Sequence, residues 1–174
     1  LEAQKGSAEA PILVLGISEW RAEECDHENI VNCLEEGQVL YFPSLPFVLT
    51  EEEQALLDPR LVSPKRKNIM YQADQESIKG IADSASENEK RAVEGLLKRY
   101  SEASYQLLTD LIPQYKGKLH SPMNTLRLNA IDEWSDSHSF RKDDRRLHVD
   151  AFPSRPLHGR RLIRIFNNIN PDGI

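Results

Sequence analysis

The residues with the clearest capacity for chemistry are His148 and Asp150, which are separated by one residue in a stretch typical of a β-strand. Successive side chains of a strand point to opposite faces, so the imidazole and the carboxylate converge on one point. One nitrogen and one oxygen ligand suit a borderline divalent metal, and a further histidine would complete the site of a non-haem Fe(II) oxygenase. Because such triplets also arise by chance, an ordinary surface pair is the alternative.

The pair lies in a basic segment of an otherwise acidic chain. The formal net charge of the 174 residues is −6, yet residues 141–164 contain eight Lys/Arg and three Asp/Glu. Guanidinium groups bind carboxylates and phosphates bidentately. This distribution indicates an anionic ligand and does not favour general nucleic-acid binding. The alternative is a solvated surface whose cations pair with acids such as Asp143 and Asp144.

A longer stretch of sequence makes the motif specific. RKDDRRLHVDAFPSRP at 141–156, followed by GRRLIRIFNNINP at 159–171, closely resembles the 3-deoxy-D-manno-oct-2-ulosonic acid (Kdo) hydroxylase family. The similarity is sharp over about Leu119 to Gly173 and weaker upstream, where Tyr41-Phe42-Pro43 and Lys67-Asn68-Ile69 fit the family. A match of this length is much more specific than the three-residue motif inside it.

The resemblance implies an Fe(II)/2-oxoglutarate-dependent dioxygenase that hydroxylates the Kdo sugar of the lipopolysaccharide inner core (Kdo-lipid A). In that reaction 2-oxoglutarate is decarboxylated to succinate, and O2 is the other cosubstrate. The resemblance assigns His148 and Asp150 to iron, as ligands and not as general acid or base. It places the distal histidine, and the basic residue that binds 2-oxoglutarate, beyond Ile174. The other histidines around the motif are expected in loops or turns: His120, His138 and His158.

Anion-binding roles are predicted for basic and amide side chains around the motif. For 2-oxoglutarate the candidates are Arg127 and Asn129 on the preceding strand and Arg164 on the following one. For the carboxylate of Kdo and the phosphates of lipid A the candidates are Arg145, Arg146, Arg155 and Arg160.

Capping signals and apolar spacing predict the helices. A short helix is expected over Glu28–Glu36, ended by Gly37, and is followed by a strand over Gln38–Phe42. A capping box of Thr50 and Glu53 predicts a helix over Ala55–Leu57. The strongest helical pattern has one apolar face and runs from the capping box of Ser86 and Glu89 to Pro113; loops and short strands are expected over Leu61–Asp83.

The pattern changes to period two from Met123 onward and predicts strands over 123–130, 146–151 and 161–169. In the last of these, one face carries Ile163, Ile165 and Asn167 and the other Leu162, Arg164, Phe166 and Asn168. Helices before strands favour an α+β fold in which helices support one face of a mostly antiparallel sheet. The resemblance narrows this to a double-stranded β-helix (jelly-roll, cupin-like) core with flanking helices, C-terminally incomplete.

One oxygenase domain is expected. Residues 1–10 are predicted as a flexible tail, about 11–118 as a helical support region, and about 119–174 as the start of the jelly-roll core. The two thiols, Cys25 and Cys33, are interpreted as reduced, and no apolar run approaches the roughly 18–20 residues of a membrane span. A cytoplasmic location is expected, with peripheral association at the inner membrane face because the substrate is lipid-linked.

Two other functions are compatible with the residues. The first is a non-catalytic jelly-roll module that binds an anionic saccharide. The second is a hydrolytic metal enzyme, which would need a general base beside a metal-bound water. Asp143 and Asp144 are poor bases because they lie in an unanchored charged run. The oxygenase ranks first, the binding module second and the hydrolase third.

Overall fold

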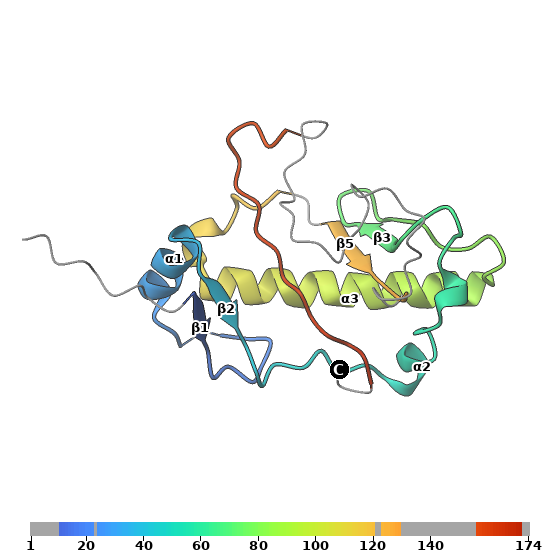
Figure 1. Ribbon diagram of the computed structural model, residues 1–174, viewed down its shortest axis with the longest axis horizontal. Helices are drawn as coiled ribbons and strands as arrows, with labels where there is room; N and C mark the ends of the chain where they lie inside the picture. The colour runs from blue at the N-terminus through green and yellow to red at the C-terminus, as the bar shows by residue number, and fades with distance from the viewer. Residues whose placement is uncertain (1–10, 23, 121–122, 130–155, 172–174) are drawn as a thin grey trace, which may run out of the picture.

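The computed structural model describes residues 11–22, 24–120, 123–129 and 156–171, which form a mixed α and β structure (Figure 1). In chain order the elements are β1 (Ile12–Val14), α1 (His27–Glu35), β2 (Val39–Tyr41), α2 (Glu51–Gln54), η1 (Pro59–Leu61), β3 (Ile69–Gln72), β4 (Ser77–Lys79), α3 (Glu87–Leu111), η2 (Pro113–Tyr115) and β5 (Met123–Leu126). The expected tail 1–10 and the expected strand over 146–151 lie outside the described residues.

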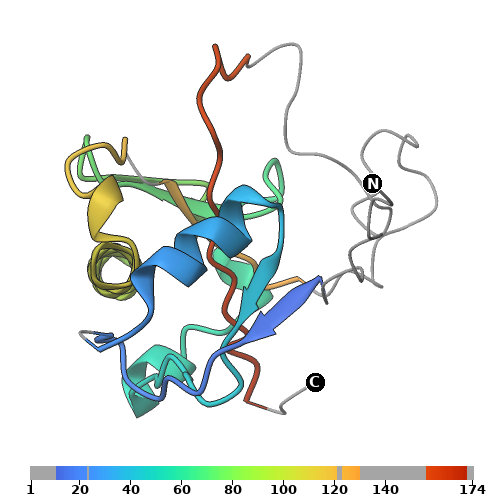
Figure 2. The ribbon, with the colours of Figure 1, turned by 90° about the vertical axis from the view of Figure 1, so that its left-hand side faces the viewer.

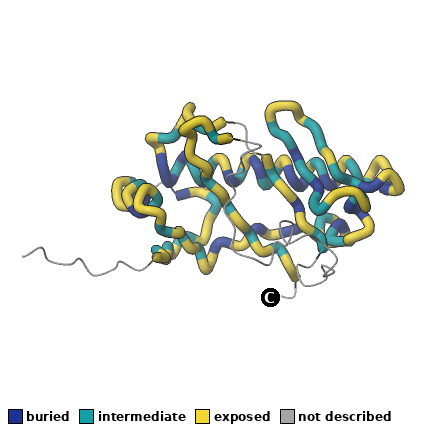
Figure 3. The backbone as a smooth tube through the Cα atoms, turned by 45° about the horizontal axis from the view of Figure 1, so that its top comes forward, coloured by how far each residue is buried: buried dark blue, intermediate teal, exposed yellow. Residues whose placement is uncertain are grey.

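The long helix α3 is the centre of the molecule. Its N-terminus has the predicted capping box: Ser86 Oγ accepts the Glu89 N–H at 3.2 Å, and the Glu89 carboxylate accepts the Ser86 N–H at 2.8 Å. Buried residues recur along one side of the helix, as Figure 3 shows. Of the helices that the structure describes, none is long and apolar enough to cross a membrane.

A three-stranded antiparallel sheet, in the order β4-β3-β5, packs against α3. In its register Ile69 of β3 pairs with Leu126 of β5, and both side chains are buried in one core cluster with Val93 and Leu97 of α3. The alternation predicted for residues 123–130 is therefore confirmed as far as Leu126. Its apolar side is the side that α3 covers.

A second, smaller layer lies at the C-terminal end of α3. There β1 and β2 pair in parallel, and α1 buries Ile30 against Leu107 and Leu111 of α3. Helix α1 begins after the N-cap Asp26, and the predicted Gly37 ends it at φ +84°. The sequence did not predict β1, because its apolar residues belong to a short run without alternation.

Helix α2 differs from its prediction. The capping box of Thr50 and Glu53 is present, but the helix is the single turn Glu51–Gln54 and its C-cap is Ala55. The expected span Ala55–Leu57 therefore lies after the helix. An ion pair fixes this turn to α3, because Arg99 reaches Glu53 with two N–H groups, at 3.0 and 2.5 Å. The contact lowers the pKa of Glu53, although partial burial opposes that shift.

The segment 161–170, drawn in red in Figures 1 and 2, crosses the molecule beside α3. Its exposure alternates residue by residue as predicted, with exposed even-numbered and half-buried odd-numbered positions from Leu162 to Ile169. It is nevertheless not a strand of a sheet in the described part of the chain. The strand predicted over 161–169 is wrong in this respect: the pattern gives extended backbone, but strand pairing also needs a neighbour.

Candidate functional site

Two extended segments lie across the same side of α3, namely β5 and 161–170 (Figure 1). Each turns one set of side chains toward the helix. From β5 that set includes the buried Leu126, and from 161–170 it includes Ile163 and Ile169, which pack against the core. The opposite, exposed side chains define what we call the open face: Met123, Thr125 and Arg127, with Leu162, Arg164 and Phe166.

Among the described residues, the segment 161–170 is held in place by side-chain contacts and not by a ladder of backbone hydrogen bonds. The Tyr100 hydroxyl of α3 donates to the Ile165 carbonyl at 3.4 Å, and Asn167 Nδ2 donates to the Leu45 carbonyl at 3.5 Å. At the start of the segment, the Arg161 guanidinium pairs with Glu35 of α1. Burial raises the pKa of the Tyr100 hydroxyl, so this group stays protonated and remains a donor.

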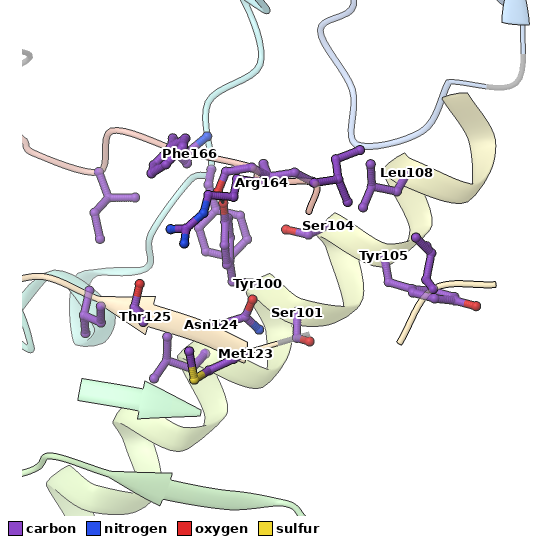
Figure 4. A pocket seen from close by; sticks show the side chains of 18 of the residues that line it. Tyr100, Ser101, Ser104, Tyr105, Leu108, Met123, Asn124, Thr125, Arg164 and Phe166 are labelled. Carbon is purple, nitrogen blue, oxygen red and sulfur yellow. Dashed lines mark hydrogen bonds between the residues drawn. The ribbon is translucent and has the colours of Figure 1, made fainter. Parts of the chain in front are cut away.

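A cleft of about 410 Å³ separates β5 from 161–170, with α3 as its floor (Figure 4). Apolar side chains such as Leu97 and Leu126 make up much of its lining. Two buried polar atoms at its walls, Asn124 Nδ2 and Asn167 Oδ1, have no hydrogen-bond partner within the described structure. One offers a donor and the other an acceptor, so whatever occupies the cleft gains hydrogen bonds that are otherwise lost.

The described residues of the predicted site do not all meet. Arg164 lines the cleft, as Tyr100 and Phe166 do (Figure 4). Arg127 is exposed just past the other end of β5, where its Nε donates to Asn68 Oδ1 at 3.3 Å. Asn129 is half-buried two residues later.

Arg160 lies in the turn that directly precedes the segment 161–170. It is exposed, and its backbone N–H bonds the Leu157 carbonyl at 2.9 Å. The remaining predicted residues lie outside the described ranges, namely His148, Asp150, Arg145, Arg146 and Arg155. Within the described ranges, no three His, Cys, Asp or Glu side chains gather closely enough to hold a metal ion.

Sequence reasoning missed several residues that line the cleft. Asn124 could have been found, because it belongs to the alternating strand and is the one polar residue on the side that faces α3. His120, expected in a loop, is exposed and lines the cleft as well. Tyr100 packs in the core, with its ring centroid 5.1 Å from that of Phe47, but its hydroxyl also reaches the segment 161–170.

Known proteins match the chain at the level of sequence and of structure. A family profile described as 3-deoxy-D-manno-oct-2-ulosonic acid (Kdo) hydroxylase matches residues 18–174. A crystal structure of the Kdo hydroxylase KdoO with cobalt(II), described as a non-heme Fe(II) alphaketoglutarate-dependent dioxygenase, has a TM-score of 0.76 and 39% sequence identity. That match covers 83% of this chain and 48% of the KdoO chain.

The same enzyme has been solved with bound ligands. Its complex with alphaketoglutarate and Fe(III) gives a TM-score of 0.74 and 37% identity, over 83% of this chain and 47% of that one. The complex with succinate and Fe(III) gives 0.73 and 38%, with the same coverage. The chain thus spans about half the length of the solved relatives that it matches. No curated protein matches it.

Proposed function

The chain belongs to the Kdo hydroxylase family, and from that premise we propose that it is part of an Fe(II)/2-oxoglutarate-dependent dioxygenase. Its substrate is the Kdo sugar of the lipopolysaccharide inner core, as Kdo-lipid A, and succinate is the product of the cosubstrate. The observation that carries the proposal is the 39% identity to KdoO at a TM-score of 0.76. Since the match covers about half of KdoO, the activity belongs to the complete protein.

The iron ligands in this proposal are His148 and Asp150. An imidazole nitrogen and a carboxylate oxygen on one face of a strand are a donor set that fits Fe(II) and leaves positions open for 2-oxoglutarate and O2. When bound, the iron with its cosubstrates supplies the oxidation that hydroxylates a C–H bond of the sugar. A third protein ligand is needed, and we assign it to sequence that corresponds to the uncovered half of KdoO.

The finer fold proposed here is a jelly-roll core, and the cleft supports it. On one side of the cleft lies β5, the edge strand of the sheet β4-β3-β5. On the other side lies 161–170, which is extended and alternating but pairs with no strand among the described residues. One further strand placed in the cleft would hydrogen-bond both segments and cover the apolar floor on α3. The result would be a continuous sheet with helices on one face only.

In such a sheet the open face is the side that can meet ligands, because α3 covers the other. Arg164 is well placed there for an anion: its guanidinium can bind a carboxylate bidentately, and aromatic and apolar side chains border the same cleft. Tyr100 positions it indirectly, through the bond to Ile165. Roles in cosubstrate binding for Arg127 and Asn129 remain predictions, as do roles in substrate binding for Arg145, Arg146, Arg155 and Arg160.

A lipid-linked substrate also implies work at a membrane surface, so we propose peripheral association with the membrane that holds Kdo-lipid A. Anionic headgroups attract clusters of Lys and Arg without any spanning helix.

Turnover tests the proposed function directly. The complete protein, loaded with Fe(II), is incubated with 2-oxoglutarate, O2 and Kdo-lipid A, and products are identified by mass spectrometry. We expect one oxygen atom added to Kdo for each succinate formed, and loss of both products in His148→Ala but not in His158→Ala. Saccharide binding without succinate formation would instead indicate a non-catalytic binding module.

A further inference from the structure

One basic motif has no role in the proposed active site. Between Pro59 and Ala73 the sequence has four Lys/Arg and no Asp/Glu. Arg60 is paired with Asp58, at 2.7 Å, and with Glu89. The other three cations are consecutive, Lys65-Arg66-Lys67, and belong to residues 63–68, which we call the basic turn. The first two are exposed and the third is half-buried.

Backbone hydrogen bonds tie the basic turn to the end of the sheet. Its Arg66 N–H bonds the Ser63 carbonyl at 2.9 Å, and the Ser63 N–H bonds the Gly80 carbonyl at 2.8 Å. Gly80 is required there, because a Cβ at this position would lie 2.4 Å from the Asn68 carbonyl oxygen. The backbone that carries the cations is therefore held at a defined place, so only their side chains have to order on binding.

The basic turn also lies beside the end of β5, the strand that carries part of the open face. Ile69 pairs with Leu126, so Asn68 and Arg127 follow at the same end of the sheet, and their side chains are hydrogen-bonded at 3.3 Å. Arg127 is thus a further cation beside Asn68, the last residue of the basic turn. A surface that attracts this end of the sheet brings the open face close to itself.

We propose that the basic turn docks the protein onto the anionic surface of the membrane that carries the lipid-linked substrate. This inference rests on the proposed function, which supplies the reason for the protein to be at a membrane. An extended anionic surface fits better than a single bound phosphate, since Lys65 and Arg66 are exposed and do not line the cleft. The net charge of −6 opposes general attraction to such a surface, so binding depends on local groups of cations such as the basic turn.

Vesicle sedimentation tests the proposal. The complete protein is mixed with phosphatidylcholine vesicles that contain or lack phosphatidylglycerol, at low and high sodium chloride. For the native protein we expect binding to the anionic vesicles that high salt removes. Lys65→Gln/Arg66→Gln should weaken the partition constant by roughly thirtyfold, given the contribution of each cation near an anionic surface. The matched control is Lys116→Gln/Lys118→Gln, two exposed lysines of another turn, which should change it less than about twofold.

The other outcomes overturn the proposal. Equal weakening by both double variants would mean that net charge alone drives binding. Unchanged binding of Lys65→Gln/Arg66→Gln would mean that the basic turn does not contact the membrane. Displacement by inorganic phosphate, beyond the effect of chloride at equal ionic strength, would indicate a phosphate site in place of a membrane contact. Vesicle binding requires no iron, so loss of the proposed oxygenase activity with docking intact would refute only the function.

Discussion

The region around α3 and the segment 161–170 both have the regular apolar spacing of secondary structure, but they are held in place by different contacts. In the α3 region, caps, backbone ladders and apolar burial all support the same arrangement: the capping box starts the helix, β3 pairs with both β4 and β5, and Val93 and Ile69 are fully buried. In 161–170 the alternation is equally regular, yet the segment is held by a few side-chain contacts, and Phe166 is 81% exposed.

The difference shows that a period-two pattern encodes the two faces of a segment but not its neighbours. β5 and 161–170 have similar patterns, but β5 has a partner strand in the described structure and 161–170 has none. The segment 161–170 has no partner strand among the described residues, and its side chains are exposed beside a cleft. These two features make it a candidate functional face. The predictions below test this contrast.

The largest expected effect is on stability in the α3 region. Leu97→Ala removes a side chain that is 3% exposed and should lower the free energy of unfolding by about 2–5 kcal/mol. Phe166→Ala, on the open face, should change it by less than about 0.5 kcal/mol. Urea unfolding of both variants measures the contrast. Comparable losses would mean that Phe166 is buried in the complete protein and that the two regions form one core.

A glycine pair tests how tightly the sheet of the α3 region is built. Gly80→Ala should destabilise the protein by roughly 1–3 kcal/mol, because φ is +85° and the added Cβ meets the Asn68 carbonyl oxygen. Gly95→Ala is the control: no atom lies within 4 Å of its Cβ position in α3, so it should stabilise by up to about 1 kcal/mol. A tolerated Gly80→Ala, seen in the thermal midpoint, would show that the basic turn can move.

On the open face the expected effect is on binding. Arg164→Gln should raise KM for 2-oxoglutarate about ten- to a hundredfold, since a charge-assisted hydrogen bond contributes roughly 1.5–3 kcal/mol. Its thermal midpoint should stay near that of the native protein. Arg91→Gln, an exposed arginine on α3, is the control. A fall in stability with unchanged KM would make Arg164 a structural residue.

The smallest effect is expected from pH, at the N-terminus of α3. The hydrogen bond from Arg60, together with those from Ser86, lowers the pKa of Glu89 to about 2. Because the folded-state pKa lies below the ordinary value of 4.5, this contribution is present above about pH 4.5 and is lost as pH falls toward 2. Thermal midpoints across this range should fall less steeply for Glu89→Gln than for the native protein. Glu102→Gln is the control and should follow the native protein. If the thermal midpoints of Glu89→Gln and of the native protein fell equally with pH, the result would contradict the ion pair between Arg60 and Glu89.

Sequence alone predicted most of the α3 region, because its signals are local. The capping box of Ser86 and Glu89 and the spacing of Val93, Leu97 and Leu107 determine α3 without knowledge of its partners. The short β1 was missed, and the turn α2 was placed too late, because a few residues carry too little pattern to set their boundaries.

The candidate site could be predicted only in part. Alternation placed Arg164 and Phe166 on one face correctly, since face membership follows from spacing alone. It could not show that Arg127 bonds Asn68 or that Arg164 borders a cleft over Tyr100, because these contacts join segments far apart in the chain. The proposed metal ligands, His148 and Asp150, came from a motif and a family resemblance, and they lie outside the described residues.

The most direct test of the central claim is an anaerobic titration of the complete protein with Fe(II) and then 2-oxoglutarate, followed by visible absorption. If His148 and Asp150 hold the iron, a weak charge-transfer band should appear on addition of 2-oxoglutarate. His148→Ala and Asp150→Ala should lack the band, and His158→Ala should retain it. A band that survives in His148→Ala, or no band in the native protein, would contradict the account.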